Sequence, residues 1–173
     1  MNRLLITGVG SLIGQGIIKS IKDSSLDSII IGTDYFPSAV GLYRVNKGYI
    51  LPDILRPEIS ESEWVDALIQ VINKEKVSIV LPGLDFEISI LARNKKTIKQ
   101  QTGSTVLVSS KKIVSVGNDK WETVNYLRDN NFHYPKSCLP DTLGTFLTNN
   151  SFPLIVKPIV GHTSENVFLV NNE

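Results

Sequence analysis

Short, uninterrupted runs of hydrophobic residues recur along the first two thirds of the chain, at positions 4–6, 29–31, 79–81 and 106–108. Most of the intervals between these runs carry the helical spacing of apolar residues. A strand that is buried on both faces needs a continuous apolar run, whereas in a strand with one solvent-exposed face apolar and polar residues alternate. The pattern therefore predicts an α/β fold, with a mainly parallel sheet and helices on both of its faces.

Two helix starts are marked by capping residues. Ser60 and Glu63 form a capping box, and the apolar face that follows is formed by Trp64, Leu68, Val71 and Ile72. Asp119 and Glu122 fit an N-cap and its partner, and the face that we expect to be buried there is formed by Trp121, Val124 and Leu127. Such faces pack most simply into a core.

The composition is that of an ordinary globular protein, because 42% of the 173 residues are hydrophobic and 20% are charged. The net charge is +1 with both signs mixed along the chain, which does not favour binding to nucleic acid or to an anionic membrane. The single cysteine, Cys138, and two histidines do not supply a Cys/His metal cage. No apolar run is long enough for a membrane span, so we expect a cytoplasmic protein.

A glycine-rich segment follows the first predicted strand, with Gly8, Gly10 and Gly14 in front of a predicted helix. Glycines there allow a tight turn, a close backbone approach and close helix packing, beside a helix N-terminus that attracts anions. The second predicted strand ends at Asp34, where dinucleotide-binding proteins keep the acid that binds ribose. An NAD(P)-dependent oxidoreductase is therefore one open interpretation, although the spacing G-x-G-x-x-x-G is one residue longer than the usual fingerprint.

Two acidic residues, Asp85 and Glu87, follow the predicted strand at 79–81. Ligands of an open parallel sheet bind beyond the carboxyl ends of the strands, which is where both carboxylates would meet a substrate. The same carboxylates also suit the first turn of the next helix, where they offset the helix dipole. Both interpretations stay open at this stage.

A later apolar run, at 154–156, ends in Lys157 and Pro158. At the end of a buried strand, the stem of a lysine packs along apolar neighbours while its ammonium reaches a cleft, where phosphate is a natural counter-charge. The segment after it, which contains Gly161, is suited to close over such an anion with backbone N–H groups. The alternative is an ordinary edge-strand lysine with its ammonium in solvent.

Lys120 is a second candidate for anion binding, because it lies in the first turn of the helix that Asp119 starts. A helix N-terminus favours anions over cations, so a lysine there suggests a bound anion, with a merely tolerated exposed lysine as the alternative. Two shorter helices are also expected, at 109–116 and at 143–147. Asp141 and Thr142 are possible N-caps of the second.

Taken in order, these elements resemble the N-terminal part of an ATP-grasp ligase of the carbamoyl-phosphate-synthase-large-subunit-like branch. The resemblance covers essentially the whole chain. It is carried by Asp119-Lys120 at a helix start, by 131–135 in the place of the family's G-x-x-x-P, and by the strand at 153–158. It implies a Rossmann-like pre-ATP-grasp domain at 1–112 and, at 113–173, the first part of an incomplete α+β ATP-grasp nucleotide-binding domain.

The resemblance also implies roles for individual residues. In that family two lysines contact the phosphates of ATP, which implies this role for Lys120 and Lys157, and the loop with Gly161 and Ser164 covers the phosphates. Two further segments are implied to border the carboxylate substrate, and their residues are Gly8, Gly10, Gly14, Asp85 and Glu87. The family's magnesium ligands lie further on, so no metal ligand and no catalytic residue is expected within the chain.

The activity that the resemblance implies is the ligation of a small-molecule carboxylate to an amine or similar nucleophile, with ATP and Mg²⁺ and through an acyl phosphate. We expect the chain to be the N-terminal portion of such a ligase, inactive alone, with the C-terminal part as its partner. An apolar strand edge near Val167 and Leu169 also invites a homodimer. Two alternatives stay open, an NAD(P)-binding oxidoreductase and a non-catalytic nucleotide- or metabolite-binding domain.

Overall fold

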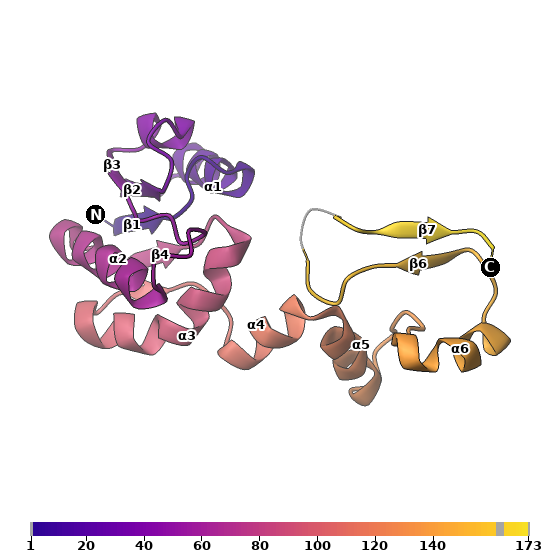
Figure 1. The fold of residues 1–173 in the computed structure, drawn as a ribbon. Helices are drawn as coiled ribbons and strands as arrows, with labels where there is room; N and C mark the ends of the chain where they lie inside the picture. The colour runs from indigo at the N-terminus through magenta and orange to yellow at the C-terminus, as the bar shows by residue number, and fades with distance from the viewer. Residues whose placement is uncertain (1, 162–164, 173) are drawn as a thin grey trace. The chain divides into compact units, whose positions relative to one another are not determined.

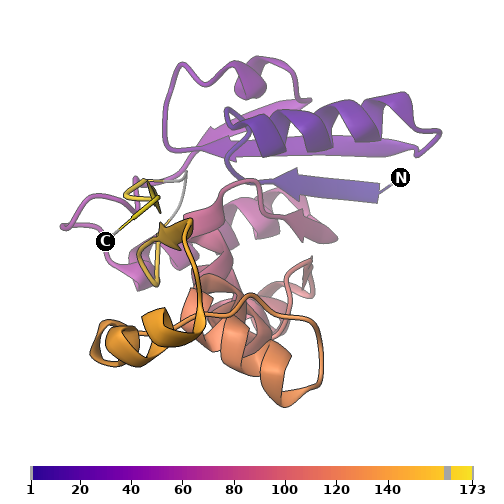
Figure 2. The same ribbon diagram turned by 90° about the vertical axis from the view of Figure 1, so that its right-hand side faces the viewer.

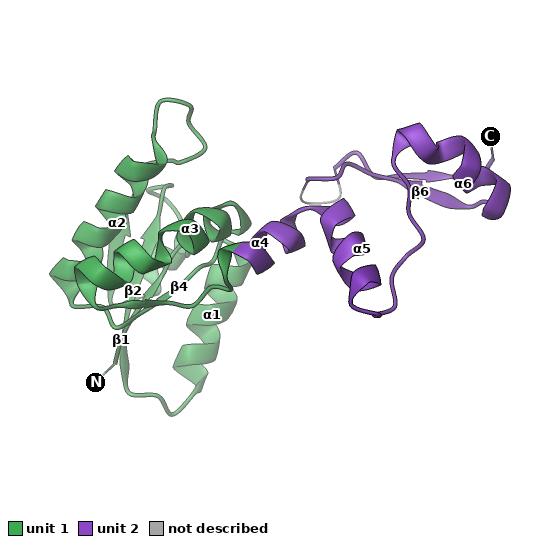
Figure 3. Cartoon of the chain, turned by 90° about the horizontal axis from the view of Figure 1, so that it is seen from below, with its two compact units in different colours: residues 1–111 green, residues 112–173 purple. Residues whose placement is uncertain are grey.

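The computed structural model describes residues 2–161 and 165–172 of the chain. The chain forms two compact units, unit 1 at residues 1–111 and unit 2 at residues 112–173, which Figure 3 shows in green and purple. Each unit has a sheet of its own. Within the described residues, no helix is both long enough and apolar enough to cross a lipid bilayer.

Unit 1 is built around a five-stranded sheet in which neighbouring strands are parallel (Figure 1). The strands are β1 (Asn2–Ile6), β2 (Ser28–Asp34), β3 (Lys47–Ile50), β4 (Ile79–Leu81) and β5 (Thr105–Val106), in the order β3-β2-β1-β4-β5. The predicted α/β fold with a mainly parallel sheet is confirmed. Of the apolar run at 106–108, only Val106 belongs to a strand, because β5 pairs with β4 over two positions.

Helices cover both faces of this sheet (Figure 2). The helices of unit 1 are α1 (Leu12–Asp23), the short 3₁₀ helix η1 (Val40–Tyr43), α2 (Glu61–Glu75) and α3 (Asp85–Thr102). Ile18 of α1 is buried with Ile6 on one face. On the other face α2 and α3 pack around Leu5 and Val80, which are fully buried in the larger core. The two cores hold the loops at the strand ends in place.

The start of α2 has the N-cap at Ser60 that the predicted capping box requires. Ser60 Oγ accepts a hydrogen bond from the N–H of Glu63 at 3.2 Å. The residues predicted to face the core are all buried, and they are Trp64, Leu68, Val71 and Ile72. Local pattern alone therefore determines both where this helix starts and which face it buries.

The last residue of α2, Glu75, is tied to two strands of the sheet by charged hydrogen bonds. Its carboxylate is only 2% exposed. It accepts from Arg3 Nη2 at 2.6 Å, from Lys47 Nζ at 2.8 Å and from Tyr49 Oη at 2.5 Å. The bonds from Lys47 and Tyr49 outweigh the effect of burial and lower the pKa of Glu75 to about 2. The carboxylate is therefore charged at neutral pH.

Unit 2 combines short helices with an antiparallel pair of strands (Figures 1 and 3). Its elements are α5 (Lys120–Asp129), the 3₁₀ helix η2 (Pro140–Thr142), α6 (Leu143–Asn149), β6 (Leu154–Val156) and β7 (Phe168–Val170). A further helix, α4 (Lys111–Asn118), begins on the last residue of unit 1 and continues into unit 2. Leu154 pairs with Val170 in the strand register.

One predicted N-cap of unit 2 is present and another is not. Asp119 Oδ1 accepts hydrogen bonds from the N–H groups of Trp121 at 2.8 Å and Glu122 at 2.9 Å, which confirms the cap of α5. Thr142 precedes α6 but makes no capping hydrogen bond through its side chain, so that prediction is wrong. Its hydroxyl instead donates to the carbonyl of Leu139 at 3.1 Å, in the turn that leads into the helix.

Hydrophobic side chains of unit 2 are mostly exposed. On α5, Val124 is buried while Trp121 and Leu127 are half-buried, so the predicted buried face is only partly present. The expectation that β6 is a buried strand is wrong, since Ile155 is 57% and Val156 56% exposed. The physical reason is that β6 pairs with β7 in a two-stranded sheet, which brings too little apolar surface together to exclude water.

Candidate functional site

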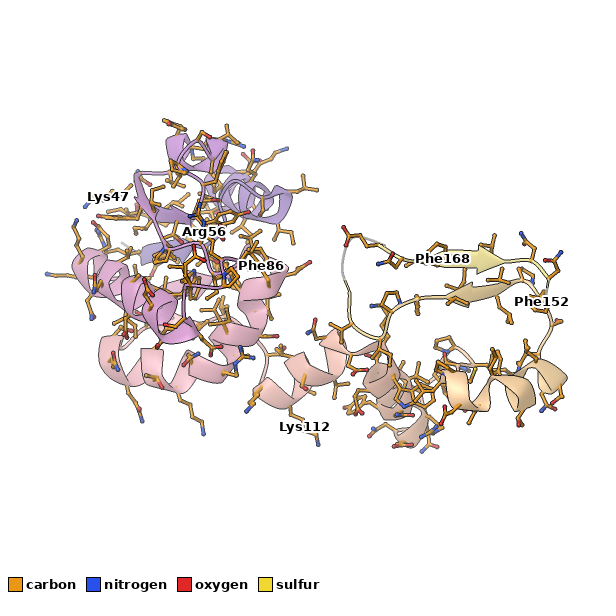
Figure 4. The ribbon with its side chains drawn as sticks, in the orientation of Figure 1. Lys47, Arg56, Phe86, Lys112, Phe152 and Phe168 are labelled. Carbon is orange, nitrogen blue, oxygen red and sulfur yellow. The ribbon has the colours of Figure 1, made fainter. Side chains whose placement is uncertain are left out.

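An open hollow of about 410 Å³ lies at the edge of the unit 1 sheet where β1, β2 and β4 end. Its lining residues come from the segments after these strands, and they are Gly10, Ser11, Asp34, Tyr35, Phe36, Ala39 and Leu84. The strand order makes this edge a topological switch point between β1 and β4, which is where open α/β sheets bind ligands. The ring of Tyr35 meets that of Phe86, labelled in Figure 4, with the centroids 6.2 Å apart.

The backbone of the glycine-rich loop is held by hydrogen bonds within unit 1. The N–H of Val9 donates to the carbonyl of Thr33 at 3.1 Å, and the N–H of Ser11 donates to the carbonyl of Gly8 at 3.0 Å. The N–H of Gly14 donates to Ser11 Oγ at 2.8 Å. These three amides are therefore not free to bind a phosphate. A dinucleotide-binding loop would instead present its amides to the pyrophosphate.

Only one of the three predicted glycines lines the hollow, and that is Gly10. Gly8 has a φ of 55°, which favours glycine, and a Cβ there would collide with the side chain of Leu84. A Cβ on Gly14 would collide with the carbonyl oxygen of Gly8, so Gly14 lets α1 approach the loop. Gly8 and Gly14 are thus needed for packing within unit 1, and Gly10 is the one that lines the hollow.

Asp34 joins the loop after β1 to the loop after β2. Its Oδ2 accepts from the N–H of Gly10 at 2.8 Å and its Oδ1 accepts from the N–H of Phe36 at 3.0 Å. The residue is 6% exposed and still lines the hollow. A carboxylate oxygen has two acceptor sites, so each oxygen keeps one site for a further donor.

The structure separates the two acidic residues that the sequence places together. Asp85 is exposed at the start of α3, while Glu87 is 3% exposed. Burial raises the pKa of Glu87 to about 7; the hydrogen bond from Thr7 opposes this, and the negative charge of Asp34 adds to it. The Glu87 carboxyl is therefore partly protonated at neutral pH and is an interior group, whereas Asp85 is free to meet solvent.

Hydroxyl groups that the sequence analysis did not single out hold the two central loops together. Thr7 Oγ1 donates to Glu87 and accepts the N–H of Gly83 at 3.3 Å. Ser11 Oγ donates to the carbonyl of Gly83 at 2.7 Å while it caps α1. The position of Ser11 directly before the predicted helix could have identified it as an N-cap. No local pattern could have identified Thr7, because its partners are far away in the sequence.

In unit 2, the structure brings Lys120 to the loop that follows Lys157. The ammonium of Lys120 donates to the carbonyl of Gly161 at 3.1 Å and approaches that of Ile159 at 3.5 Å. The backbone N–H of Lys120 also donates to the carbonyl of Ile159, at 3.0 Å. Lys157 is exposed at the end of β6. Ser164, the last residue of the expected phosphate loop, lies outside the described residues.

Asn131 stands where the family pattern has a glycine. Its φ is 59°, in the left-handed region that glycine and asparagine adopt most easily. The N–H of Asn131 donates to the carbonyl of Arg128, and the N–H of Phe132 to that of Leu127, which closes the end of α5. Asn131 thus adopts a backbone conformation that a glycine at this position would also adopt easily. Among the described residues, no group of three or more His, Cys, Asp or Glu side chains is placed to hold a metal ion.

Comparison with known structures shows the class of fold. The chain is similar to an N5-carboxyaminoimidazole synthetase from Staphylococcus aureus, complexed with ADP, with a TM-score of 0.69 and 14% identity over 99% of this chain. It is similar to an L-amino acid ligase from Bacillus licheniformis, with a TM-score of 0.64 and 16% identity over 99% of this chain. The expected resemblance to the N-terminal part of an ATP-grasp ligase is confirmed.

The family is shown by residues 4–107, which match the PylC-like, N-terminal domain. The chain belongs to this family. No curated protein matches it. A third similar structure is the biotin carboxylase domain of a 2-oxoglutarate carboxylase from Hydrogenobacter thermophilus, with a TM-score of 0.63 and 14% identity over 99% of this chain. The chain spans 42% of the length of the synthetase, 39% of the ligase and 38% of the carboxylase domain.

Proposed function

We propose that this chain is the N-terminal part of an ATP-dependent ligase that joins a small-molecule carboxylate to an amine or similar nucleophile through an acyl phosphate. The observation that carries the proposal is the contact of the Lys120 ammonium with the carbonyls of Ile159 and Gly161, two and four positions after Lys157. Membership of the PylC-like family supports it, as does the similarity to a synthetase that binds ADP.

The proposed nucleotide site is in unit 2. Lys120 and Lys157 bring two positive charges to adjoining segments, which fits the charge of a triphosphate. Gly161, with Ser164 beyond it, belongs to the loop that is proposed to cover the phosphates. Phosphoryl transfer depends mainly on positioning and on neutralising charge, so in this proposal the two lysines orient ATP and stabilise the charge that develops on the transferred group.

The magnesium ligands are proposed to come from the C-terminal part of the ligase. The exposed residues of β6 and β7 are proposed to be covered by that same part, in which case the nucleotide-binding domain begins near 113 and continues beyond 173. The 173-residue chain is then inactive on its own.

Unit 1 is proposed to be the pre-ATP-grasp domain, at 1–112, of a carbamoyl-phosphate-synthase-like ligase of the cytoplasm. Its contribution is the edge of the sheet that carries the loop at 8–14 and the segment at 82–87. Gly10 lines the hollow there, Gly8 and Gly14 shape the loop, and Asp85 is exposed at the start of α3. Glu87 acts from the interior, through its hydrogen bond with Thr7.

Calorimetric titration with MgATP tests the nucleotide site. We expect weak or no binding by the 173-residue chain and clear binding by a longer protein that carries the chain together with its C-terminal part. In the longer protein, Lys120→Ala and Lys157→Ala should each weaken binding about tenfold or more, since each removes a charge-assisted hydrogen bond. Lys136→Ala is the matched control, because Lys136 is an exposed lysine of the same unit.

Two results would overturn the proposal. Tight, Mg²⁺-dependent binding of ATP by the 173-residue chain would mean that the site is misplaced. Equal affinities of the Lys120→Ala, Lys157→Ala and Lys136→Ala proteins would mean that the two lysines do not contact the nucleotide. Binding of NADH, followed by its fluorescence, would favour the oxidoreductase instead.

A further inference from the structure

Among the described residues that line the hollow in unit 1, Asp34 is the one with a carboxylic acid side chain. No lysine or arginine of the described chain lies within ion-pair distance of Asp34. Burial is the main reason for the raised pKa of the nearby Glu87, and the charge of Asp34 adds to it. Within the described residues, the acidic side chain of the lining therefore has no lysine or arginine partner.

Two polar donors of the lining, the N–H of Gly10 and the hydroxyl of Ser11, are already used within the protein. The N–H of Gly10 is bound to Asp34 itself, and the hydroxyl of Ser11 donates to the carbonyl of Gly83. A carboxylate or phosphate in the hollow would lose its hydration and gain no free donor from these two groups, and it would also face Asp34. Such a group is costly to bury without a partner.

The rest of the lining suits an organic cation. Tyr35 and Phe36 bring aromatic rings, and Ala39 and Leu84 bring apolar surface. Aromatic faces attract ammonium groups, and the attraction grows when water is excluded. Asp34 keeps an acceptor site on each oxygen, since each has one N–H partner.

We propose that the hollow binds an ammonium group with an apolar body, and that it takes the amine substrate rather than the carboxylate. The ammonium pairs with Asp34, and the body lies against Tyr35 and Phe36. This assignment rests on the proposed function, in which a ligase joins the two substrates. It differs from the resemblance, which implies that the same loops border the carboxylate.

Three probes of equal length but different charge test the assignment on the 173-residue chain. They are n-pentylammonium, 1-pentanol and pentanoate, each titrated while the amide signals of Gly10 and its neighbours are followed by NMR. We expect pentylammonium to shift these signals with an affinity at least about tenfold above that of pentanoate, with pentanol between them. Bound pentylammonium should also lower the pKa of Glu87, which can be followed through its side-chain carbon signal.

Two variants show whether the hollow is the site. Phe36→Ala removes an aromatic wall and should weaken binding of pentylammonium about fivefold. Phe168→Ala is the matched control, because both rings are similarly exposed, at 58% and 59%, and Phe168 belongs to unit 2. Asp34→Asn removes the charge, but asparagine cannot accept both N–H groups, so Phe36→Ala is the variant less exposed to misfolding.

Equal or tighter binding of pentanoate overturns the inference, and so does absence of binding by all three probes. So does an equal loss of affinity in Phe36→Ala and Phe168→Ala. The proposed function has a separate test in unit 2. If MgATP binding depends on Lys120 while pentylammonium fails to bind, the ligase assignment stands and the amine assignment falls.

Discussion

Unit 1 buries many of its hydrophobic side chains, whereas unit 2 leaves most of its own exposed. Leu5 in β1 is fully buried, whereas Leu169 in β7 is 61% exposed. The difference follows from the sheets, because five strands with helices on both faces enclose a core and two strands do not. In this chain, the stability belongs mainly to the unit with the hollow, and the unit with the two lysines has few buried contacts to hold it.

The polar groups show the same contrast. In unit 1, Glu75 and Glu87 are buried and their pKa values are shifted in opposite directions, to about 2 and about 7. In unit 2, Lys120 makes its side-chain contacts with carbonyl groups near the surface. Mutations should therefore change the free energy of unfolding in unit 1 far more than in unit 2.

The largest difference is expected for a pair of leucine truncations. Leu5→Ala should lower the free energy of unfolding by about 2–5 kcal/mol, because it removes buried methyl groups and leaves a cavity. Leu169→Ala should change it by less than about 0.5 kcal/mol, because the side chain is mostly in water. Urea denaturation of both proteins measures the difference. Similar losses would show that unit 2 has a core that its exposed residues conceal.

Glu75→Gln should lower the free energy of unfolding by about 3 kcal/mol at neutral pH, because Arg3 and Lys47 would lose their buried counter-charge. The native pKa of about 2 lies below the usual 4.5. Glu75 therefore stabilises the native state above about pH 4.5, and this contribution is lost as the pH falls towards 2. Denaturation curves over this range should show a smaller acid-induced loss in the variant.

The control for this prediction is Glu61→Gln. Glu61 also pairs with an arginine, Arg93, at 2.5 Å, but its side chain is 39% exposed. An exposed pair contributes little, so the loss should stay within about 1 kcal/mol. Equal losses in the two variants would mean that burial does not strengthen the Glu75 network.

Glu87→Gln, unlike Glu75→Gln, should raise the free energy of unfolding at alkaline pH. The native state holds the Glu87 proton up to about pH 7, whereas a carboxyl with the usual pKa of 4.5 releases it earlier, so stability falls as the pH rises between these values. Glutamine stays neutral and accepts the Thr7 hydroxyl, so the variant should gain about 1–3 kcal/mol over the native protein at pH 8. Unfolding curves at pH 5 and pH 8 measure this. A loss at both pH values would contradict it.

The smallest effect is expected from the helix caps. Ser60→Ala removes the cap of α2 and should lower the free energy of unfolding of unit 1 by about 1 kcal/mol. Asp119→Ala removes the cap of α5 and should lower the helix content without changing the unfolding of unit 1. Circular dichroism and amide exchange distinguish the two. An equal loss of unit 1 stability in both proteins would mean that the units unfold together.

Much of the fold could be predicted because it depends on neighbours in the sequence. The capping box at Ser60 and the apolar face of α2 were readable from one short segment, as was the cap at Asp119. The left-handed φ of 59° at Asn131, in contrast, was not predicted from the sequence. The exposure of β6 could not be predicted either, because the sequence of an apolar strand does not show whether another element packs on it.

The sequence by itself determined the strand and helix pattern, the parallel sheet and the family resemblance, because periodicity and capping are local properties. Only the tertiary structure decided that Glu87 is buried while Asp85 is exposed, and that Asp34 faces the hollow while it holds Gly10. Thr7 and Glu87, which share a hydrogen bond, are 80 positions apart in the sequence. Burial and charge state depend on such distant partners, which no local pattern specifies.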